Sequence, residues 1–572
     1  MLSSSASIKL AENGNLPDFS AVGDVGARQA VAFETRFGEP FLRIPPFPGA
    51  KVSHFARSRN VSCLDADIVD EIRRLRVGGT YWAAQPDLPS NCVIVRSAAA
   101  LRAAEPLADG RPIVLWSAKG ASSVPFRGSM SISGDCDPWH IAQSAALVVL
   151  EPDDEFRIIA RLLDVPTFVH KVDTSRTIEE DVDAAALLAD ILSGTEFDNP
   201  FTGAAMSAAE AVELCGFWRR LIDSNRGIAG GIGFAFWKQD HVAPLLWNGA
   251  APFRFLRTAP EAAPRGPVAL WRAKAAPQAV SALEQFRTPL IEIEDGFLRS
   301  RGLGADCIPP LSITVDRLGA HFDPARESEL ERLLQDGEFD EQLLTRAREL
   351  RRLIVTAGLG KYGQGSASID RPAGKRRHIL VPGQVEDDRA VQAGGCGLTS
   401  NLELLKLVRE QEPDAFILYK PHPDVLAGHR KGAVADRISL RYADRVVGDA
   451  AIGSLIDMVD DVHVNTSLAG FEALLRGKAV TTYGVPFYAG WGLTRDLGPV
   501  PARRTARRSL DELVAATLLL YPRYLDPVTG LPCPAEIVVE RLSAGDAPEP
   551  GLLVGVRRLQ GKLKRRLRSL VQ

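Results

Sequence analysis

Two loops of the chain gather side chains that could do chemistry, and each follows a short apolar run. The runs, Ile379 to Pro382 and Ala415 to Tyr419, have the length and composition of buried strands. Beyond them come Gln384, Glu386, Asp387 and Asp388 after the first, and Lys420, His422, Pro423 and Asp424 after the second. Because open α/β sheets bind ligands beyond the carboxyl ends of their strands, we predict an active centre in these loops.

The second loop, KPHPD at 420–424, has the residue types of a phosphate site. Lys420 offers a point charge and His422 an imidazole donor, and both suit a phosphodiester oxygen. The alternative is a histidine between two prolines that only stiffens a turn. The loop by itself leaves both interpretations open.

The segment NTSLAGFEALLRGK at 465–478 indicates a second anion site. Thr466 or Ser467 is a natural N-cap for a helix that begins near Ala469, and the free amides of a helix start attract anions. Glu472 falls one turn into that helix, where it could accept ribose hydroxyls. The alternative is plain capping with a solvated glutamate.

The segment IEDGFLRSRGLG at 293–304 places Glu294 and Asp295 at the end of another strand, with Arg299 and Arg301 after them. Carboxylates beside arginines often form a structural ion-pair network. If they face Glu386–Asp388 across a cleft, they also provide the paired carboxylates that glycosyl transfer requires.

An aromatic, glycine-rich loop, FYAGWGLTRD at 487–496, has neither GxGxxG nor P-loop spacing. It therefore supports neither dinucleotide binding nor NTP hydrolysis. We expect Phe487, Tyr488 and Trp491 either to close over a ligand or to pack a domain hinge.

Two series of strands and helices must position these residues. Short buried runs between helices are typical of parallel sheets, so we predict two α/β domains in tandem with a cleft between them. The first series begins near Gly231 and the second at Arg377. The other expected elements are strands at 267–271 and 289–294 and helices over Glu327–Leu334, Asp340–Val355 and Ser509–Tyr521.

The first half of the chain repeats this pattern loosely, with strands expected at 92–95, 112–116, 146–150 and 167–170. However, Glu151, Pro152 and Arg157 stand where the later copy has Thr466, Ser467 and Glu472. We interpret residues 52–225 as a decayed duplicate. The alternative is two Rossmann-like domains that are alike by architecture alone. The proline-rich stretch FLRIPPFPGA marks residues 1–51 as an extended linker.

Bulk properties limit the class of protein. The 572 residues suggest about three or four domains, and a net charge of -3 does not point to nucleic acid. The seven cysteines show no metal-ligand spacing, so we expect no metal site and a reducing, cytoplasmic compartment. No signal peptide or membrane-spanning run is recognisable.

The C-terminal tail combines leucines at helical spacing with basic residues. Between Leu552 and Leu570 the chain reads LLVGVRRLQGKLKRRLRSL. A basic amphipathic helix of this kind suits the anionic inner face of a membrane. A solvated helix that docks on its own protein is the alternative.

Taken together, the motifs EDGFLRSRGLG, ILVPGQVEDD, SNLELLKLVRE, YKPHPDVL, TSLAGFEALLRGK and PFYAGWGLT resemble the capsule polysaccharide KpsC/LipB family of β-Kdo transferases. The similarity covers roughly residues 227–540. It is greatest to the C-terminal module of the two-module members.

This resemblance implies a pair of Rossmann-like domains of GT-B type. It implies an acceptor-side domain at 226–376, a CMP-sugar-binding domain at 377–540 and a membrane-associating tail at 541–572. The implied activity is retaining transfer of 3-deoxy-D-manno-octulosonic acid (Kdo) from CMP-β-Kdo to a lipid-linked Kdo acceptor. The implied setting is the cytoplasmic side of the inner membrane, with other capsule assembly proteins as partners and no cofactor beyond the donor.

The resemblance also implies roles for individual residues. The QxxxD motif falls on Gln384 and Asp388, so Asp388 would be the nucleophile of a double displacement, with Asp387 beside it as the other choice. His422 and Pro423 form the HP motif and would serve CMP together with Lys420, Thr466, Ser467 and Glu472. Glu294 would be the acid/base or acceptor-activating carboxylate.

The first half departs from the two-module members because residues 1–225 contain no EDGF, QxxxD or HP motif. We therefore expect a single linkage, similar to the 2→7 linkage of the C-terminal module. Two other functions stay open: transfer of another CMP-activated nonulosonic acid, and a non-catalytic scaffold for capsule assembly or export.

Overall fold

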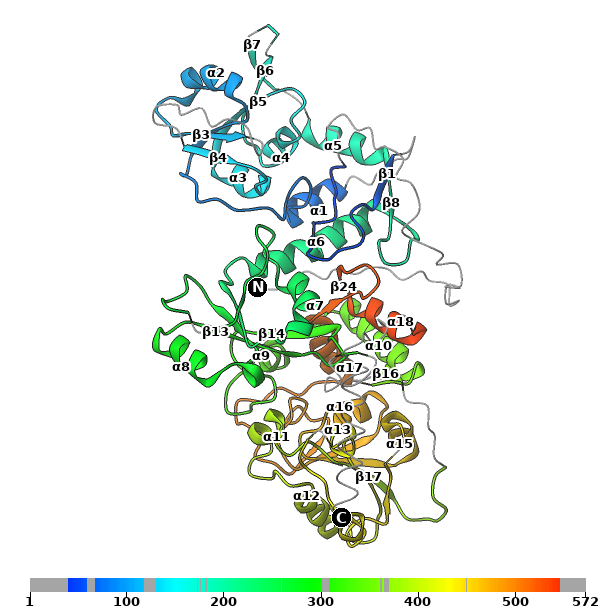
Figure 1. Cartoon of the computed structure of the whole chain (residues 1–572). Coiled ribbons are helices and arrows are strands. Elements are labelled where there is room, and N and C mark those ends of the chain that lie inside the picture. The colour runs from blue at the N-terminus through cyan, green and yellow to red at the C-terminus, as the bar shows by residue number, and fades with distance from the viewer. Residues whose placement is uncertain are drawn as a thin grey trace. The chain divides into compact units, whose positions relative to one another are not determined.

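The structure, a computed structural model, divides into two compact units (Figure 1). The N-terminal unit runs to Arg226 and includes Leu246–Pro252, and the C-terminal unit comprises Gly227–Leu245 and the chain from Phe253. The structure describes residues 40–58, 67–117, 130–171, 173–174, 176–180, 183–258, 260–300, 308–360, 363–364, 370–428, 430–448 and 450–545.

The N-terminal unit is built on a sheet of short buried strands. Its described strands are, in spatial order, β4 (Met130–Ser133), β3 (Ile113–Ser117), β2 (Cys92–Val95), β5 (Ala145–Leu150), β6 (Thr167–Lys171) and β7 (Arg176–Glu179). All pair in parallel except β6 with β7. Numbered along the chain, this is the Rossmann order 3-2-1-4-5-6.

Helices and a small second sheet complete the N-terminal unit. Val93 and Val149 of the large sheet pack against Leu101 of the helix α2. The helices are α1 (Asp67–Leu75), α2 (Ala98–Ala108), α3 (Pro138–Ser144), α4 (Phe156–Leu162), α5 (Ala184–Ser193) and α6 (Ala208–Asn225). The strands β1 (Ala56–Ser58), β8 (Thr195–Asp198) and β9 (Ala205–Met206) form an antiparallel sheet.

The proline-rich stretch before β1 is not the linker that the sequence predicts. Within the described part, Phe41, Leu42, Ile44 and Phe47 are buried. The Phe47 ring lies 5.2 Å from that of Trp247 and 6.2 Å from that of Trp218. The prolines give the segment its extended form, but its apolar side chains anchor it in the core.

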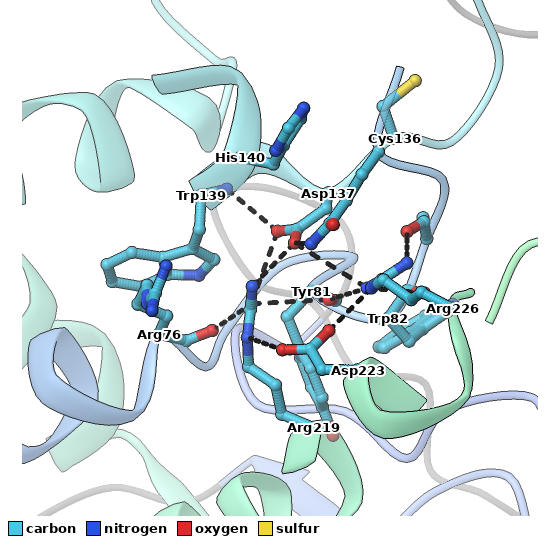
Figure 2. A network of polar contacts seen from close by, with 12 residues as sticks. Arg76, Tyr81, Trp82, Cys136, Asp137, Trp139, His140, Arg219, Asp223 and Arg226 are labelled. Carbon is cyan, nitrogen blue, oxygen red and sulfur yellow. Dashed lines mark hydrogen bonds and ion pairs between the residues drawn. The ribbon is translucent and has the colours of Figure 1, made fainter. Parts of the chain in front are cut away.

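A buried ion-pair network joins three segments of the N-terminal unit (Figure 2). Asp137, the N-cap of α3, is completely buried and accepts from Arg219 Nη2 of α6 at 2.7 Å. Arg226 donates to the carbonyl oxygen of Ala83 at 2.8 Å and pairs with Asp223 at 2.7 Å. The network therefore fixes α3, α6 and the loop after α1 together.

The C-terminal unit begins with a mixed sheet. Its described strands are, in spatial order, β11 (Phe255–Leu256), β10 (Gly230–Ile232), β12 (Val268–Leu270), β13 (Leu290–Asp295), β14 (Ser312–Asp316), β23 (Pro522–Leu525) and β24 (Pro532–Cys533). The first four pair in parallel and the rest are antiparallel. The helices of this domain are α7 (Phe236–Leu246), the short η2 (Arg272–Lys274), α8 (Pro277–Gln285), α9 (Glu329–Asp336) and α10 (Glu341–Thr356).

A fully parallel sheet forms the second domain of this unit. Its described strands are, in spatial order, β19 (Arg445–Val446), β18 (Phe416–Lys420), β17 (His378–Pro382), β20 (Asp461–Val464), β21 (Ala479–Thr482) and β22 (Arg495–Asp496). Its helices are α11 (Arg389–Gly394), α12 (Asn401–Gln411), α13 (Pro423–Leu426), α14 (Asp436–Ser439), α15 (Ile452–Met458) and α16 (Leu468–Leu475). Figure 1 shows α11, α13 and α16 gathered at one end of this sheet. The strand order is again 3-2-1-4-5-6.

The chain then returns to the first domain. The helix α17 (Leu510–Val514) passes into a π-helical stretch (Ala515–Leu520), and both pack on α10. Tyr524 of β23 then pairs with Ser312 of β14, and α18 (Ala535–Ala544) follows. The sequence assigns residues 377–540 to the second domain, whereas residues 522–533 within that range complete the sheet of the first domain. A hairpin, β15 (Leu359–Gly360) with β16 (Gly363–Gln364), lies between the domains in sequence.

The predicted α/β class with parallel sheets is confirmed. The expected strands at 92–95, 289–294, 379–382 and 415–419 are β2, β13, β17 and β18. Among the described helices, none is both long and apolar enough to cross a lipid bilayer. The basic stretch from Leu552 to Leu570 lies outside the described residues.

Candidate functional site

A cleft of about 900 Å³ in the C-terminal unit is lined by loops from both of its sheets. All nine residues that the sequence predicts for the site line this one cleft: Glu294, Gln384, Asp388, Lys420, His422, Pro423, Thr466, Ser467 and Glu472. They come from four separate segments of the chain. The fold brings these segments together at the carboxyl ends of β13, β17, β18 and β20.

Gln384 links the loop after β17 to the loop after β20. Its side-chain nitrogen donates to the Thr466 hydroxyl at 2.9 Å, and its side-chain oxygen accepts from the Thr466 amide at 2.9 Å. Asn401 fixes the backbone on both sides of Gln384, at 2.8 Å in each case. Both ends of the Gln384 amide are thus engaged within the protein, so it acts as a brace for the loop that carries Thr466.

The two adjacent aspartates after β17 have different surroundings. Asp387 pairs with Arg430 at 3.1 Å and does not line the cleft, whereas Asp388 does. Asp388 also caps α11 through the amide of Arg389 at 3.0 Å. Glu386 accepts from the Asn401 amide at 2.9 Å. Of the expected carboxylate group Glu386–Asp388, only Asp388 is therefore placed to meet a ligand.

The loop after β18 fixes the hydrogen-bonding form of His422. His422 is the N-cap of α13, and its Nδ1 accepts from the Asp424 amide at 3.1 Å. A neutral imidazole that accepts at Nδ1 carries its proton on Nε2, which makes the ring a donor there. Lys420 is buried beside it and donates to the carbonyl oxygen of Gly448 at 3.0 Å.

The loop after β20 leads into α16 as predicted. Ser467 is the N-cap and its hydroxyl accepts from the Ala469 amide at 3.2 Å. The Tyr488 hydroxyl donates to the carbonyl oxygen of Ser467, and Gly470 makes room for it, since a Cβ there would lie 2.3 Å from that hydroxyl oxygen. Glu472 is buried one turn into the helix and lines the cleft.

Glu294 approaches this loop region from the first sheet. Its Oε1 accepts from Arg389 Nη1 at 2.6 Å, so the ion pair joins the two domains of the unit. Burial raises the pKa of Glu294 to about 7, Arg389 opposes the shift, and Asp295 and Glu292 add to it. A carboxyl group with such a pKa can hold or release a proton near neutral pH.

Asp295, next to Glu294, belongs to an ion-pair network. It accepts from Lys238 Nζ at 3.0 Å and from Arg299 Nε at 2.9 Å. Lys238 also lies 3.5 Å from the centre of the Trp271 ring, and burial lowers the pKa of this lysine. Asp295 and Arg299 therefore form the structural ion-pair network that was the alternative interpretation of this segment. Arg301 lies outside the described residues.

Sequence reasoning missed Lys238, Trp271 and Arg389, all of which line the cleft. Arg389 directly follows the QxxxD motif, and that adjacency was the one local signal available. Lys238 and Trp271 stand in no motif.

The aromatic loop serves packing. Tyr488 and Trp491 are fully buried, and Trp491 Nε1 donates to the Phe487 carbonyl oxygen at 2.8 Å. Phe487 lies 4.8 Å from Phe297 of the first domain, measured between ring centres, and also lines the cleft.

Within the described residues, no three His, Cys, Asp or Glu side chains are grouped so as to hold a metal ion.

Comparison with known proteins identifies relatives of this chain. The model of the family "Capsule polysaccharide biosynthesis protein" matches residues 350–524. The capsule polysaccharide modification protein LipA of Neisseria meningitidis is 38% identical over 356 residues, which are 61% of this chain and 50% of LipA. The lipopolysaccharide-processing protein LpsZ of Rhizobium meliloti is 48% identical over 240 residues, 41% of this chain and 54% of LpsZ.

Two solved structures from Thermosulfurimonas dismutans are also similar. The KpsC β-Kdo 2,4 transferase is 33% identical, with 55% of this chain and 98% of that chain covered and a TM-score of 0.48. The KpsC β-Kdo 2,7 transferase is 33% identical, with 56% and 99% covered and a TM-score of 0.45. The chain spans about half the length of the curated relatives it matches. With these identities and the family match, the chain belongs to the capsule polysaccharide KpsC/LipB family, as its motifs predict.

Proposed function

We propose that the C-terminal unit is a retaining glycosyltransferase that moves Kdo from CMP-β-Kdo to a lipid-linked Kdo acceptor in capsule synthesis. The observation that carries the proposal is the convergence of all nine predicted residues on one cleft. The printed activities of the two KpsC relatives support the choice of sugar. The 2,4 and the 2,7 transferase are equally identical to this chain, at 33% each. Analysis of the product is therefore needed to establish which linkage the chain makes.

The nucleotide is proposed to bind on the parallel sheet. The amides at the start of α16, with Thr466 and Ser467, attract the phosphate, because a helix start carries partial positive charge. Lys420 adds a positive charge and His422 an Nε2 donor. Glu472, one turn into α16, is the proposed acceptor for the ribose hydroxyls.

The transfer is proposed to run in two displacements. A carboxylate oxygen of Asp388 attacks the anomeric carbon C2 as the bond from C2 to the phosphate oxygen breaks, and CMP leaves. The acceptor hydroxyl then attacks C2, gives its proton to Glu294 and displaces Asp388. Two inversions return the original configuration.

The arrangement of the two α/β domains around this cleft supports a GT-B-like layout in which cleft closure is part of catalysis.

We also propose that the protein lies on the cytoplasmic face of the inner membrane and works with other capsule assembly or transport proteins. Removing residues 552–572 would then abolish sedimentation with vesicles that contain anionic lipid. Unchanged sedimentation would contradict a membrane role for that segment.

Mass spectrometry of the protein incubated with CMP-Kdo tests the central proposal. A Kdo adduct is expected on the peptide that contains Asp388. Asp387→Asn should keep the adduct and Asp388→Asn should lose it, because only Asp388 lines the cleft. Absence of both an adduct and CMP release with a Kdo-lipid acceptor would overturn the proposal, and equal CMP release from CMP-sialic acid would change the sugar.

A further inference from the structure

Arg389 is positioned to do more than hold the domains together. It follows Asp388 directly, opens α11 and lines the cleft. Its guanidinium carbon lies 5.0 Å from the centre of the Phe322 ring, and 31% of its side chain is exposed. The guanidinium is thus oriented by contacts on two sides and remains reachable from the cleft.

Other arginines that line the cleft are committed elsewhere. The Arg299 side chain is 1% exposed and donates to Asp295, to the Ser300 hydroxyl and to the carbonyl oxygen of Ile308. The Arg476 side chain is 2% exposed and is held by carbonyl oxygens and Asp457. Arg430 pairs with Asp387, which does not line the cleft.

Arg389 differs from Arg299 and Arg476 in its exposure and from Arg430 in its partner. Its Nη1 lies 2.6 Å from Glu294, which lines the cleft, and 3.6 Å from Glu292. An arginine paired with a carboxylate can exchange that partner for another carboxylate without losing a charge pair. Its planar fork suits two parallel hydrogen bonds to such a group.

The donor of the proposed function, on which this inference rests, supplies such a group. Kdo is a 2-keto sugar acid, so its carboxylate is bonded to C2, the carbon that Asp388 attacks. A cation beside Asp388 therefore meets this carboxylate whenever C2 is within reach of the nucleophile.

We propose that Arg389 recognises the carboxylate of the donor sugar, and that this carboxylate displaces Glu294, which takes up one proton from solvent. The charged groups that face Glu294 are Arg389, Asp295, Lys238 and Glu292. Lys238 and Arg299 are already occupied with Asp295. Loss of Arg389 thus leaves Glu294 buried among negative charges, and its pKa, already about 7, rises further.

The exchange would prepare Glu294 for both steps of transfer. Its proton passes to the phosphate oxygen of the departing CMP as the bond to C2 breaks. Glu294 is then a carboxylate again when the acceptor hydroxyl arrives. Sugar acids would be selected over neutral sugars because only they carry the group that frees Glu294.

Calorimetric titration of the full chain with CMP-Kdo and with CMP tests the first half of the proposal. Asp388→Asn is the background, since it stops turnover and asparagine still caps α11. Adding Arg389→Gln is expected to weaken CMP-Kdo binding about 30-fold or more and to change CMP binding less than twofold. Arg389→Lys, which keeps the charge without the fork, should fall between.

Equal weakening for CMP and CMP-Kdo, or no weakening for either, would overturn the role of Arg389. If the protein with Arg389 intact binds CMP-Kdo no better than CMP and wild type does not consume it, the proposed function itself fails. The two failures are therefore distinguishable.

Proton uptake tests the second half. Titrations at pH 8 in buffers of different ionisation enthalpy should show close to one proton taken up with CMP-Kdo and none with CMP. Glu294→Gln should bind CMP-Kdo without uptake. Binding of CMP-Kdo without any uptake by the protein that retains Glu294 would overturn the exchange.

Discussion

The strands β17 and β20 of the C-terminal unit and β2 and β5 of the N-terminal unit occupy the same two places in sheets of the same order. In the C-terminal unit the loops after these strands are joined by the neutral side chains of Gln384 and Thr466. In the N-terminal unit they are joined by an ion pair, in which Arg96 donates to Asp154 at 2.7 Å. The loops at the same position of the fold are thus linked by neutral hydrogen bonds in one unit and by an ion pair in the other.

The ion pairs occupy the crevice of the N-terminal unit. Its hollow of about 480 Å³ is lined by Arg43, Arg96, Ser97, Glu151, Asp153, Asp154 and Glu155. Arg43 pairs with Glu155 at 2.6 Å, so both arginines already hold carboxylates of their own unit. A bound phosphate would have to displace them. In the C-terminal unit Gln384 and Thr466 join the corresponding loops, and Thr466 and Ser467 line the cleft at the start of α16. Loops of different sequence thus complete the same strand ends differently on a shared architecture.

The predicted duplication is consistent with this comparison but does not follow from it. Arg157, which the sequence aligns with Glu472, is buried in α4 and pairs with Glu180 at 2.8 Å. A decayed copy and an independent Rossmann-like domain would both have the observed strand order. The duplication stays a prediction.

The largest effect is expected at the two helix caps that follow β17 and β2. Asp388 caps α11 and Ser97 caps α2. Asp388→Asn is expected to lower kcat for Kdo transfer roughly 10³-fold or more, because it removes the proposed nucleophile and keeps the cap. Ser97→Ala, the matched cap of the other sheet, should leave kcat unchanged. Similar losses in both variants would end the functional distinction between the two sheets.

A stability effect is expected from the network around Asp137 (Figure 2). Asp137→Ala leaves Arg219 buried without its main counter-charge and should cost about 3–5 kcal/mol of unfolding free energy in the N-terminal unit. For a domain of this size, the calorimetric Tm should fall roughly 10 °C.

Asp70→Ala is the control, since its pair with Arg73 is exposed and should contribute about 0.5 kcal/mol or less. Kdo transfer measured well below the transition should be the same in both variants. If Asp137→Ala lowers kcat while the fold persists, the N-terminal unit takes part in transfer and the comparison needs revision.

Local signals were enough to predict much of the site. The apolar runs ILVP and AFILY, followed by the polar loops GQVEDD and KPHPD, predict the strands β17 and β18 correctly. This signal is local, because the strand and its loop together take only about ten residues. Ser467 was expected as a cap on the same grounds, and its hydroxyl accepts from the Ala469 amide.

The features that sequence reasoning missed depend on distant contacts. The pair Arg389–Glu294 joins residues 95 positions apart, so the sequence around either residue does not indicate this contact. The strand Pro522–Leu525 pairs with β14, which lies about two hundred residues earlier in the chain, and the sequence PRYL alone does not indicate which sheet it joins. Phe47 looked like part of a linker because Trp218 and Trp247, which bury it, are far along the chain.

The smallest predicted effect concerns the two links that join the paired loops. Gln384→Ala removes both hydrogen bonds to Thr466 and leaves the loop before α16 less well fixed. Each neutral hydrogen bond contributes about 1 kcal/mol, and part of the loss is recovered by water. The Kd for CMP should therefore rise about tenfold, measured by calorimetric titration.

Asp154→Ala cuts the corresponding link of the N-terminal unit and is the matched control. It should leave CMP affinity unchanged, because the crevice that it opens lacks the residues proposed to hold the nucleotide. If Gln384→Ala binds CMP as wild type does, the neutral link is not what prepares the loop for phosphate. The difference between the two sheets would then have to come from Lys420, His422 and the start of α16 alone.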